Sequence, residues 1–330
     1  MKYLTIILCF VLICSCNDNE PEHGNEIERA TIIFDTDIIS STDDLVALCA
    51  LYKYMDEGKC DVIGIVVDRV GEINAACVDV FNTFYGHPEI PIGLVRNGIK
   101  DAKVFIDYSG VVNWKDADGG PLFPRSIEDY STLPEGWELY RSLLQSAPDK
   151  SVTIVSVGFV TALAQLLTSE GGQRLVADKV KALYIMGGRF NGGKPDYNFA
   201  QGLEFAHTFF SLWPENTPVV FSPSEVGAGI YYSKQQLLDD FSGKGLNPLN
   251  EIYQRYDEDK TQKMWDPLTV IQAVEGDDLF TLSEWGYVTL DDEGNTSFTA
   301  SPSGNCRYQK PGNDQWNTAT LNKIRHLIMP

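Results

Sequence analysis

The chain has 330 residues, of which 43% are hydrophobic, and a formal net charge of -20 at pH 7. This acidic balance argues against a basic face that binds nucleic acid, and it favours cations or neutral small molecules as ligands. No Pro/Gly/Ser-rich or charged linker divides the chain after its first segment, which favours one large domain over residues 29–330.

The N-terminal segment has the pattern of an export signal. A basic start and a continuous apolar run over residues 3–13 precede Cys-Ser-Cys at positions 14–16. The run is too short for a comfortable spanning helix. Its end resembles a bacterial lipoprotein lipobox, although an ordinary cleaved signal is the alternative. We therefore expect a signal peptide at 1–15, a lipidated Cys16, a flexible acidic tether at 16–28 and a lipid anchor in a bacterial cell envelope as the only membrane contact.

Short apolar, often β-branched runs then alternate with segments of helical spacing. The expected strands cover residues 30–35, 62–67, 91–95, 152–157, 182–186 and 219–222. The expected helices cover residues 43–55, 73–85, 137–146, 160–168 and 202–212. This order predicts an α/β fold with an open, mostly parallel sheet flanked by helices. Residues 285–290 and 296–300 predict a small C-terminal β hairpin.

Four cysteines follow the leader: Cys49, Cys60, Cys77 and Cys306. Their wide, irregular spacing is typical of neither a disulfide framework nor a zinc site, although one bridge is allowed in an oxidising envelope. We expect Cys49 and Cys77, which fall in helical segments, to be buried as small apolar residues.

The first predicted strand runs into a loop that carries Asp35, Asp37, Asp43 and Asp44. Because a Ser/Thr/Asp cluster precedes the next helix, this loop lies between the carboxyl end of a strand and a helix N-terminus, where open α/β sheets place ligands. A single Asp there is more often a helix cap. Several like charges would repel one another without a hard cation, so the cluster predicts a metal site.

Two families begin with a strand that ends in Asp-x-Asp. Haloacid dehalogenase-type phosphatases expect Thr or Val where this chain has Ile39, and they leave the pair Asp43-Asp44 without a role. The chain resembles the inosine-uridine-preferring nucleoside hydrolases much better, over about residues 31–273. The similar segments, in order, are the acidic loop, Gly64-Ile65, residues 85–92, residues 155–161, residues 186–188 with 195–199, and Trp265-Asp266-Pro267.

The resemblance implies a single-domain nucleoside hydrolase fold and hydrolysis of the N-glycosidic bond of a ribonucleoside by a water activated by Ca²⁺. The implied metal ligands are Asp37, Asp44, the Val157 backbone carbonyl and Asp266. The implied substrate-binding residues are Asp43, Met186, Asp196 and Asn198, although Asn198 fits a structural role equally well. Asp37 would also be the general base, and Asp35 would orient the loop. The partner is then a small nucleoside or ribosyl compound, and the family implies a homodimer or homotetramer.

The residue before Asp266 is Trp265, where many family members have a His that acts as general acid. Some purine-preferring members have Trp there, which implies that the departing base is activated by stacking and that purines are preferred. Trp114 or Tyr108 would assist. The alternative is that Trp265 only forms a wall of the pocket.

Three departures from the family pattern concern the site. The turn at 38–42 is long and lacks Gly, and the usual Ala-Gly-Asn after Ile65 is replaced by a stretch in which Asp68 is the candidate ribose contact. Asp196 is one methylene shorter than the usual Glu. Because of these changes, an alternative function is also considered: the protein would be a lipoprotein of the same fold that binds a sugar or nucleoside without hydrolysing it.

Overall fold

The computed structural model describes residues 29–255 and 262–329. The predicted signal peptide and the tether with Cys16 lie outside these residues. Among the helices that the structure describes, none combines the length and the apolar character needed to cross a membrane.

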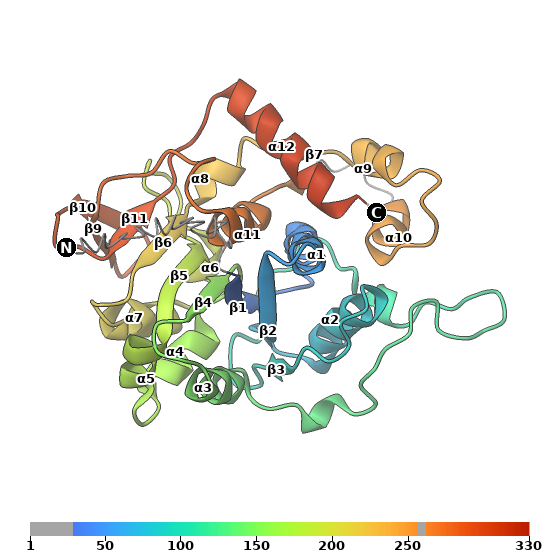
Figure 1. Ribbon diagram of the computed structural model, residues 1–330, viewed down its shortest axis with the longest axis horizontal. Helices are drawn as coiled ribbons and strands as arrows, with labels where there is room; N and C mark the ends of the chain where they lie inside the picture. The colour runs from blue at the N-terminus through green and yellow to red at the C-terminus, as the bar shows by residue number, and fades with distance from the viewer. Residues whose placement is uncertain (1–28, 256–261, 330) are drawn as a thin grey trace, which may run out of the picture.

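The centre of the described chain is a nine-stranded sheet in the order β10-β9-β11-β6-β5-β4-β1-β2-β3 (Figure 1). The parallel strands are β1 (Ala30–Thr36), β2 (Cys60–Val67), β3 (Ile92–Leu94), β4 (Val152–Ser156), β5 (Val180–Met186), β6 (Val219–Ser222) and β11 (Cys306–Tyr308). The predicted hairpin forms β9 (Gly286–Leu290) and β10 (Thr296–Ala300), which are antiparallel. It extends the main sheet because β11 joins β9 to β6.

Helices cover both faces of this sheet. One face carries α1 (Asp43–Asp56), α2 (Glu72–Phe84), α10 (Pro248–Arg255), α11 (Asp266–Glu275) and α12 (Asp314–Ile328). The other carries α3 (Gly136–Ser146), α4 (Thr161–Thr168), α5 (Gly172–Lys179) and α7 (Leu203–Leu212). The remaining elements are η1 (Ser109–Val112), η2 (Tyr130–Thr132), α6 (Tyr197–Ala200), α8 (Ser224–Gly227), β7 (Tyr231–Tyr232), α9 (Lys234–Asp240) and β8 (Gln262–Lys263).

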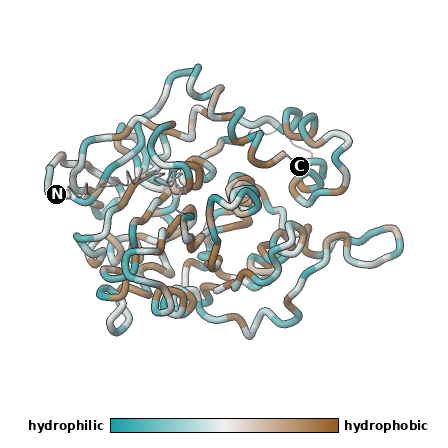
Figure 2. The backbone as a smooth tube through the Cα atoms, in the orientation of Figure 1, coloured by the Kyte–Doolittle hydropathy of each residue, from teal (hydrophilic) through white to brown (hydrophobic). Residues whose placement is uncertain are grey.

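Strand β1 shows why the hydrophobic residues of the central strands form a continuous run rather than alternating with polar residues. Ile32 and Phe34 belong to the apolar cluster under α1, whereas Ile33 belongs to the cluster on the opposite face. Because helices cover both faces, each of these side chains is fully buried. Brown, hydrophobic stretches accordingly follow the central strands in Figure 2.

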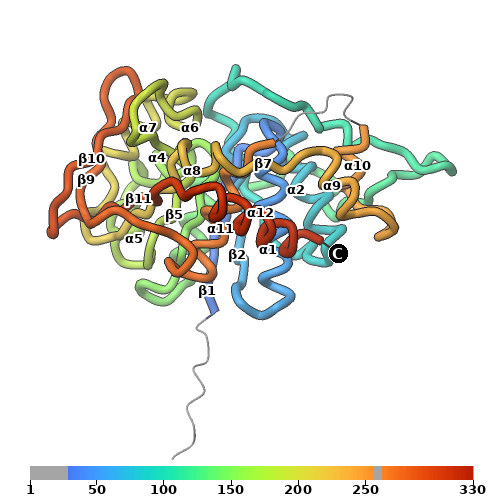
Figure 3. Tube along the Cα trace, turned by 90° about the horizontal axis from the view of Figure 1, so that it is seen from above, coloured from blue at the N-terminus to red at the C-terminus, as the bar shows by residue number. Residues whose placement is uncertain are grey.

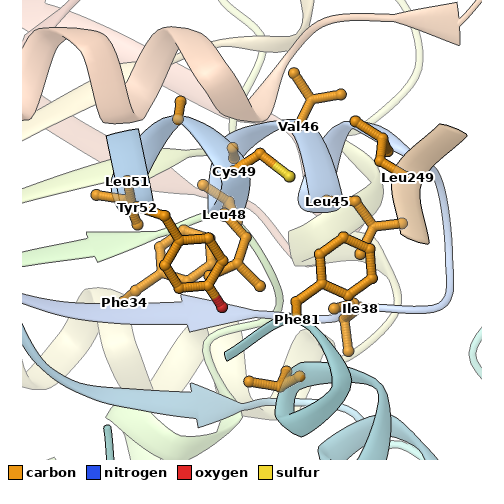
Figure 4. Packing of buried hydrophobic residues seen from close by; sticks show 14 of the residues in the cluster. Phe34, Ile38, Leu45, Val46, Leu48, Cys49, Leu51, Tyr52, Phe81 and Leu249 are labelled. Atoms are coloured by element: carbon orange, nitrogen blue, oxygen red, sulfur yellow. The ribbon is translucent and has the colours of Figure 1, made fainter. Parts of the chain in front are cut away.

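Helix α1 directly follows the acidic loop, and most of its residues are buried. Its residues Leu45, Leu48 and Tyr52 lie among Phe34 and Phe81 in the packed core (Figure 4). Full burial of one such side chain contributes about 1.5–3 kcal/mol. The N-terminus of α1, which carries the second acidic pair, is therefore held rigidly over the sheet.

The four described cysteines, Cys49, Cys60, Cys77 and Cys306, are free and buried. Cys49 lies in α1 and Cys77 in α2, as the helical spacing predicted.

The strand order β3-β2-β1-β4-β5-β6 reverses direction between β1 and β4. In open α/β sheets, ligands bind outside the carboxyl ends of the strands at such a point. In Figure 3 the described chain enters at the lower end of β1, and the carboxyl ends point up toward the edge where α6 lies. The acidic loop after β1 and the segment after β4 thus flank one crevice.

Candidate active site

A cavity of about 660 Å³ opens at this edge, a size common for small-molecule sites. Its walls come from the segments that follow β1, β3, β4, β5 and β6, from β8 and from the start of α11. The predicted catalytic, metal and substrate residues all line it: Asp37, Asp43, Asp44, Val157, Met186, Asp196, Asn198, Trp265 and Asp266. Residues far apart in the sequence therefore meet in one place, as predicted.

The ends of β1 and β4 touch directly. The Val157 N–H donates to the Asp35 carbonyl at 2.8 Å. A Cβ atom at Gly158 would lie 2.3 Å from the backbone N of Asp37, so any other residue there would push the two segments apart. Asp35 itself lies below the cavity, where its carboxylate accepts a hydrogen bond from the Tyr140 hydroxyl at 2.8 Å. Asp35 thus links the end of β1 to Tyr140 in α3.

Three buried carboxylates form the densest group in the cavity. One oxygen each of Asp43, Asp44 and Asp266 lies within 4.8 Å of the others. Thr36 donates a hydrogen bond to Asp44. Burial raises the pKa of Asp44 and of Asp266 well above the usual range, and the neighbouring carboxylates raise both further. Hard oxygen ligands of this kind suit Ca²⁺, and the cation would offset their repulsion.

Asp43 also organises the start of α11. Its Oδ2 accepts the backbone N–H of Trp265 at 3.1 Å and that of Asp266 at 3.4 Å, and its Oδ1 accepts from the Ser41 hydroxyl. An acceptor at a helix N-terminus satisfies free N–H groups. The group of three carboxylates thus contains Asp43, which was predicted to contact ribose. It does not contain Asp37, which the resemblance implied as a metal ligand with Asp44 and Asp266.

Asp37 faces a buried arginine instead. The Arg69 Nη2 lies 3.1 Å from Asp37 Oδ2, and Arg69 Nε donates to the Asp37 carbonyl at 2.9 Å. Both side chains are buried, at 7% and 5% exposure. Burial raises the pKa of Asp37 to about 6, with the Arg69 charge opposing the rise. Arg69 was not among the predicted site residues. The only sequence signal for it was its position just after β2, next to the stretch in which the family's Ala-Gly-Asn is replaced.

The structure overturns the idea that Asp68 substitutes for the missing ribose contact. Asp68 is buried, but its Oδ2 accepts the Ala162 N–H at 3.2 Å, at the start of α4. It is not among the residues that line the cavity. Asp68 therefore stabilises the N-terminus of α4 and is not placed to bind a ligand in the cavity.

The segment after β5 contains Asp196 and Asn198, which are predicted to bind the sugar. Asp196 accepts hydrogen bonds from the Asn198 N–H at 3.0 Å and from the Ser224 hydroxyl. The Asn198 amide donates to the carbonyls of Val157, at 2.9 Å, and Met186, at 3.1 Å. Asn198 therefore ties the end of β4 to the end of β5, and it also lines the cavity.

Trp265 is fixed as a wall of the cavity. Its indole N–H donates to the Ser224 carbonyl at 2.8 Å, and its backbone N–H is held by Asp43. The Lys263 ammonium lies 5.5 Å from the centre of its ring. A ring held at both ends presents a fixed π face, which is what stacking on a base requires.

The predicted assistants of Trp265 lie elsewhere. Trp114 packs under the Arg255 guanidinium, 4.2 Å from the ring centre, and Tyr108 is buried below the loop. Neither is among the residues that line the cavity. The aromatic side chains that line it besides Trp265 are Phe105 and Tyr197, whose rings lie 5.2 Å apart.

Tyr108 instead explains the long turn at residues 38–42. Its hydroxyl accepts from the Ile39 N–H at 2.7 Å and donates to the Ser41 carbonyl at 3.0 Å. Ile39 has φ 66°, a left-handed conformation that is unfavourable for a β-branched residue. The Ser40 carbonyl also accepts from Phe105 and Ile106, both at 3.0 Å. The turn without Gly is therefore held in place by the segment that follows β3.

Comparison with curated proteins finds no significant match. The structure is similar to three solved nucleoside hydrolases, and each alignment covers 91% of this chain and 99% of the other. An inosine-guanosine nucleoside hydrolase has a TM-score of 0.68 at 18% identity. The plant nucleoside hydrolase PpNRh1 has 0.67 at 18%, and a purine-preferring ribonucleoside hydrolase from Gardnerella vaginalis has 0.64 at 17%. These similarities confirm the predicted fold.

The family model described as "Inosine-uridine preferring nucleoside hydrolase" matches residues 32–320. The match begins in β1 and ends within α12, so it contains the acidic loop, the segments after β4 and β5, and the start of α11. The chain therefore belongs to the inosine-uridine preferring nucleoside hydrolases, the enzymes that hydrolyse the N-glycosidic bond of nucleosides.

Proposed function

We propose that the protein is a Ca²⁺-dependent ribonucleoside hydrolase that prefers purine nucleosides and acts from a lipid anchor in a bacterial cell envelope. The observation that carries the proposal is the buried group Asp43, Asp44 and Asp266, whose oxygens lie within 4.8 Å of one another in the same cavity as Asp37 and Trp265. The lipid anchor rests on the sequence pattern that ends at Cys16.

The metal would be held by Asp44, Asp266 and the Val157 carbonyl, with Asp43 or Asp37 as a further ligand. When bound, Ca²⁺ would lower the pKa of a water and fix its position. Asp37 is the base that takes the proton from the attacking water, because its pKa of about 6 leaves it ionised yet basic near neutral pH. Arg69 keeps its carboxylate in place.

The ribose would be bound between the two acidic sides of the cavity. Asp196 and Asn198 offer hydrogen-bonding groups from one side, and Asp43 offers its carboxylate from the other. Cleavage of the N-glycosidic bond develops oxocarbenium character on the sugar. Carboxylates around the ring stabilise that positive charge more strongly in the transition state than in the ground state, which lowers the barrier.

The base would stack on Trp265. The wider π system of a purine gains more from such a contact than a pyrimidine does. Two of the solved relatives are named for inosine and guanosine or for purine preference, and this agrees with the proposed choice.

Replacing Trp265 with Ala is expected to lower kcat for inosine by about fivefold to tenfold, since a stacking contact of about 1–1.5 kcal/mol is lost in the transition state. Trp265→Phe should retain part of the rate, and KM should change less than kcat. Steady-state kinetics on both variants measure this, with Trp114→Phe as the matched control outside the cavity. An unchanged kcat for Trp265→Ala would show that the ring is only a wall.

The function itself is tested by giving the full chain inosine, guanosine, adenosine, uridine and cytidine, each with Ca²⁺ and then with a chelator. We expect reducing sugar to appear with Ca²⁺, fastest from the purine nucleosides, and to stop after chelation. Release that continues in the chelator would contradict the metal role, and faster release from uridine would contradict the purine preference.

A second candidate function is binding of a ribosyl compound without hydrolysis. The ion pair between Asp37 and Arg69 favours it, because a base already paired with a cation is a weaker proton acceptor. The Asn198 amide also occupies one acceptor site of the Val157 carbonyl. Calorimetric binding of inosine in the same samples distinguishes the two, since binding without any release of sugar would support this second function.

A further inference from the structure

We propose that Arg69 is a positioning residue for the hydrolysis. It fixes the base Asp37 to one wall of the cavity, formed by residues 102–106 and Tyr197, so that the carboxylate is in place only while this wall is. The kinetic part of the inference rests on the proposed function, whereas the contacts of Arg69 with the wall can be tested without any substrate.

Arg69 lies just after β2, at the edge of the sheet where the carboxyl ends of the parallel strands meet the cavity. Its guanidinium contacts the segments that follow β1, β3, β4 and β5, through Asp37, Ala102 with Lys103, Phe159 and Tyr197 respectively. The Arg69 side chain is buried, and it is not among the residues that line the cavity. Arg69 therefore acts on the site through its neighbours rather than by touching the substrate.

The hydrogen bonds of the guanidinium join the base directly to the wall. The Nε atom donates to the Asp37 carbonyl at 2.9 Å, and Nη1 donates to the Ala102 carbonyl at 3.2 Å. The Nη2 atom lies 3.1 Å from Asp37 Oδ2, 3.2 Å from the Tyr197 hydroxyl oxygen and 3.4 Å from the Lys103 carbonyl oxygen. One nitrogen thus holds the carboxylate of the base and both parts of the wall.

Tyr197 connects the two parts of the wall with each other. Its hydroxyl donates to the Lys103 carbonyl, and its ring lies 5.2 Å from the ring of Phe105, which lines the cavity with it. The ring of Phe159 lies 5.9 Å from the ring of Tyr197 and 5.3 Å from the Arg69 Cζ atom. The aromatic lining of the cavity and the position of the base therefore share the same guanidinium.

A guanidinium transmits movement between its partners because it is planar and carries five donors in fixed directions. If the wall moved away, buried N–H groups of Arg69 would lose their acceptors, which is unfavourable. The guanidinium would turn toward other acceptors, and the Asp37 carboxylate would turn with it. Since a displacement of about 1 Å near the reacting atoms can lower a rate by about a hundredfold, the chemical step depends on the wall.

Arg69→Gln is expected to lower kcat for inosine by about tenfold to a hundredfold and to change KM by less than about threefold, because the base is misplaced while the ribose contacts remain. The wall should stay folded, since the Ser40 carbonyl still accepts from the N–H groups of Phe105 and Ile106. Arg69→Lys keeps the charge but not the fork of donors, so it should recover little of the rate. Full recovery with Lys, or a rise in KM alone, would overturn the positioning role.

A double-mutant cycle tests the link between the base and the wall. Tyr197→Phe removes only the hydroxyl that joins Arg69 to the Lys103 carbonyl, and it should also lower kcat. Because both changes break one network, the double variant Arg69→Gln/Tyr197→Phe should be about as slow as the slower single variant. Losses that add up in full would show that the two side chains act independently, and they would overturn the coupling.

Limited proteolysis tests the same contacts without substrate. Trypsin can cleave after Lys103 only when the carbonyl of this residue leaves its donors Arg69 and Tyr197, so the cleavage reports local opening of the wall. Arg69→Gln should be cleaved at Lys103 about tenfold or more faster than the unaltered chain, as measured from fragment masses. The matched control Arg96→Gln removes a guanidinium that binds two backbone carbonyls outside the cavity, and it should leave this cleavage and kcat unchanged.

The results of these tests separate the inference from the proposed function. If the unaltered chain released no sugar, the proposed function would be wrong, and faster cleavage at Lys103 in Arg69→Gln would still uphold the link between Arg69 and the wall. If the unaltered chain hydrolysed inosine and Arg69→Gln had the same kcat or the same cleavage rate, the inference would be wrong and the proposed function would stand.

Discussion

Replacing Asp37 with Asn is expected to lower kcat by about a thousandfold, the middle of the range for loss of a general base. Asn keeps the size of the side chain, and its amide oxygen still accepts from Arg69, so the loop should keep its path. Substrate binding should change by only a few-fold. Single-turnover measurements on the variant separate the chemical step from binding.

The pH dependence of the same variant provides an independent readout. Asp37 must be ionised to accept a proton, and burial raises its pKa to about 6 in the metal-free protein. Because bound Ca²⁺ lowers the pKa of a nearby carboxyl group, kcat/KM of the Ca²⁺-loaded protein should rise with pH at a midpoint below about 6. Asp37→Asn should lose this rise. Asp118→Asn, an exposed change outside the cavity, should keep both rate and profile. A normal rate for Asp37→Asn would place the base elsewhere.

Addition of Ca²⁺ is expected to raise the melting temperature of the metal-free protein by roughly 5 °C or more at pH 8 and by little at pH 4. A cation at about a hundred times its Kd adds about 2.7 kcal/mol to the free energy of unfolding. The effect depends on pH because the cation needs ionised ligands, and burial raises the pKa of Asp44 and Asp266 well above the usual range. Thermal melts from pH 4 to pH 8, with Ca²⁺ or chelator, measure it.

The same raised pKa values determine how the metal-free protein responds to pH. In the unfolded chain these carboxyls ionise near pH 3.8, whereas folded Asp37 ionises near pH 6 and Asp44 and Asp266 well above 3.8. The folded state therefore binds more protons, and the stability present below about pH 4 is lost as the pH rises through the folded values. For Asp37 the loss is about 3 kcal/mol. Ca²⁺ should reverse it.

The difference between the Ca²⁺ and chelator melts at each pH isolates the cluster from the rest of the chain. Carboxylates such as Asp240, whose pKa is lowered chiefly by hydrogen bonds from Arg325, destabilise the protein at acid pH in both samples. Asp266→Asn should remove most of the Ca²⁺ effect, with Asp118→Asn again as the control. A rise that is the same at pH 4 and pH 8 would exclude these buried carboxylates as the site.

The regular part of the fold was predictable because its signals are local. Strands such as β1 are continuous apolar runs, and helices such as α1 have apolar residues at helical spacing, so their bounds agree with the predicted ranges within a few residues. Helix α12 was not predicted. Its buried residues are few and gather toward its C-terminal end, among them Ile324, Leu327 and Ile328, because it packs on α1 rather than into the sheet.

The positions of the carboxylates were predictable for the same reason. Asp37, Asp44 and Asp266 each follow a recognisable pattern in the sequence, and the order of parallel strands brings the loops after them to one edge. Their hydrogen bonds and charges were not predictable, because the partners are distant in sequence. Tyr108 holds Ile39, Arg69 pairs with Asp37, and Asp43 caps the helix that begins at Asp266.

The sequence by itself determined the fold class, the family resemblance and the residues of the cavity, since local periodicity and motif spacing are properties of the chain. Only the tertiary structure decided what each charged group faces, since burial and electrostatic contact depend on side chains brought together from different strands. In the folded protein Asp68 accepts a hydrogen bond at a helix terminus, and Asp37 pairs with Arg69. The acidic loop is therefore explained by the sequence, and the partners of its carboxylates by the tertiary structure.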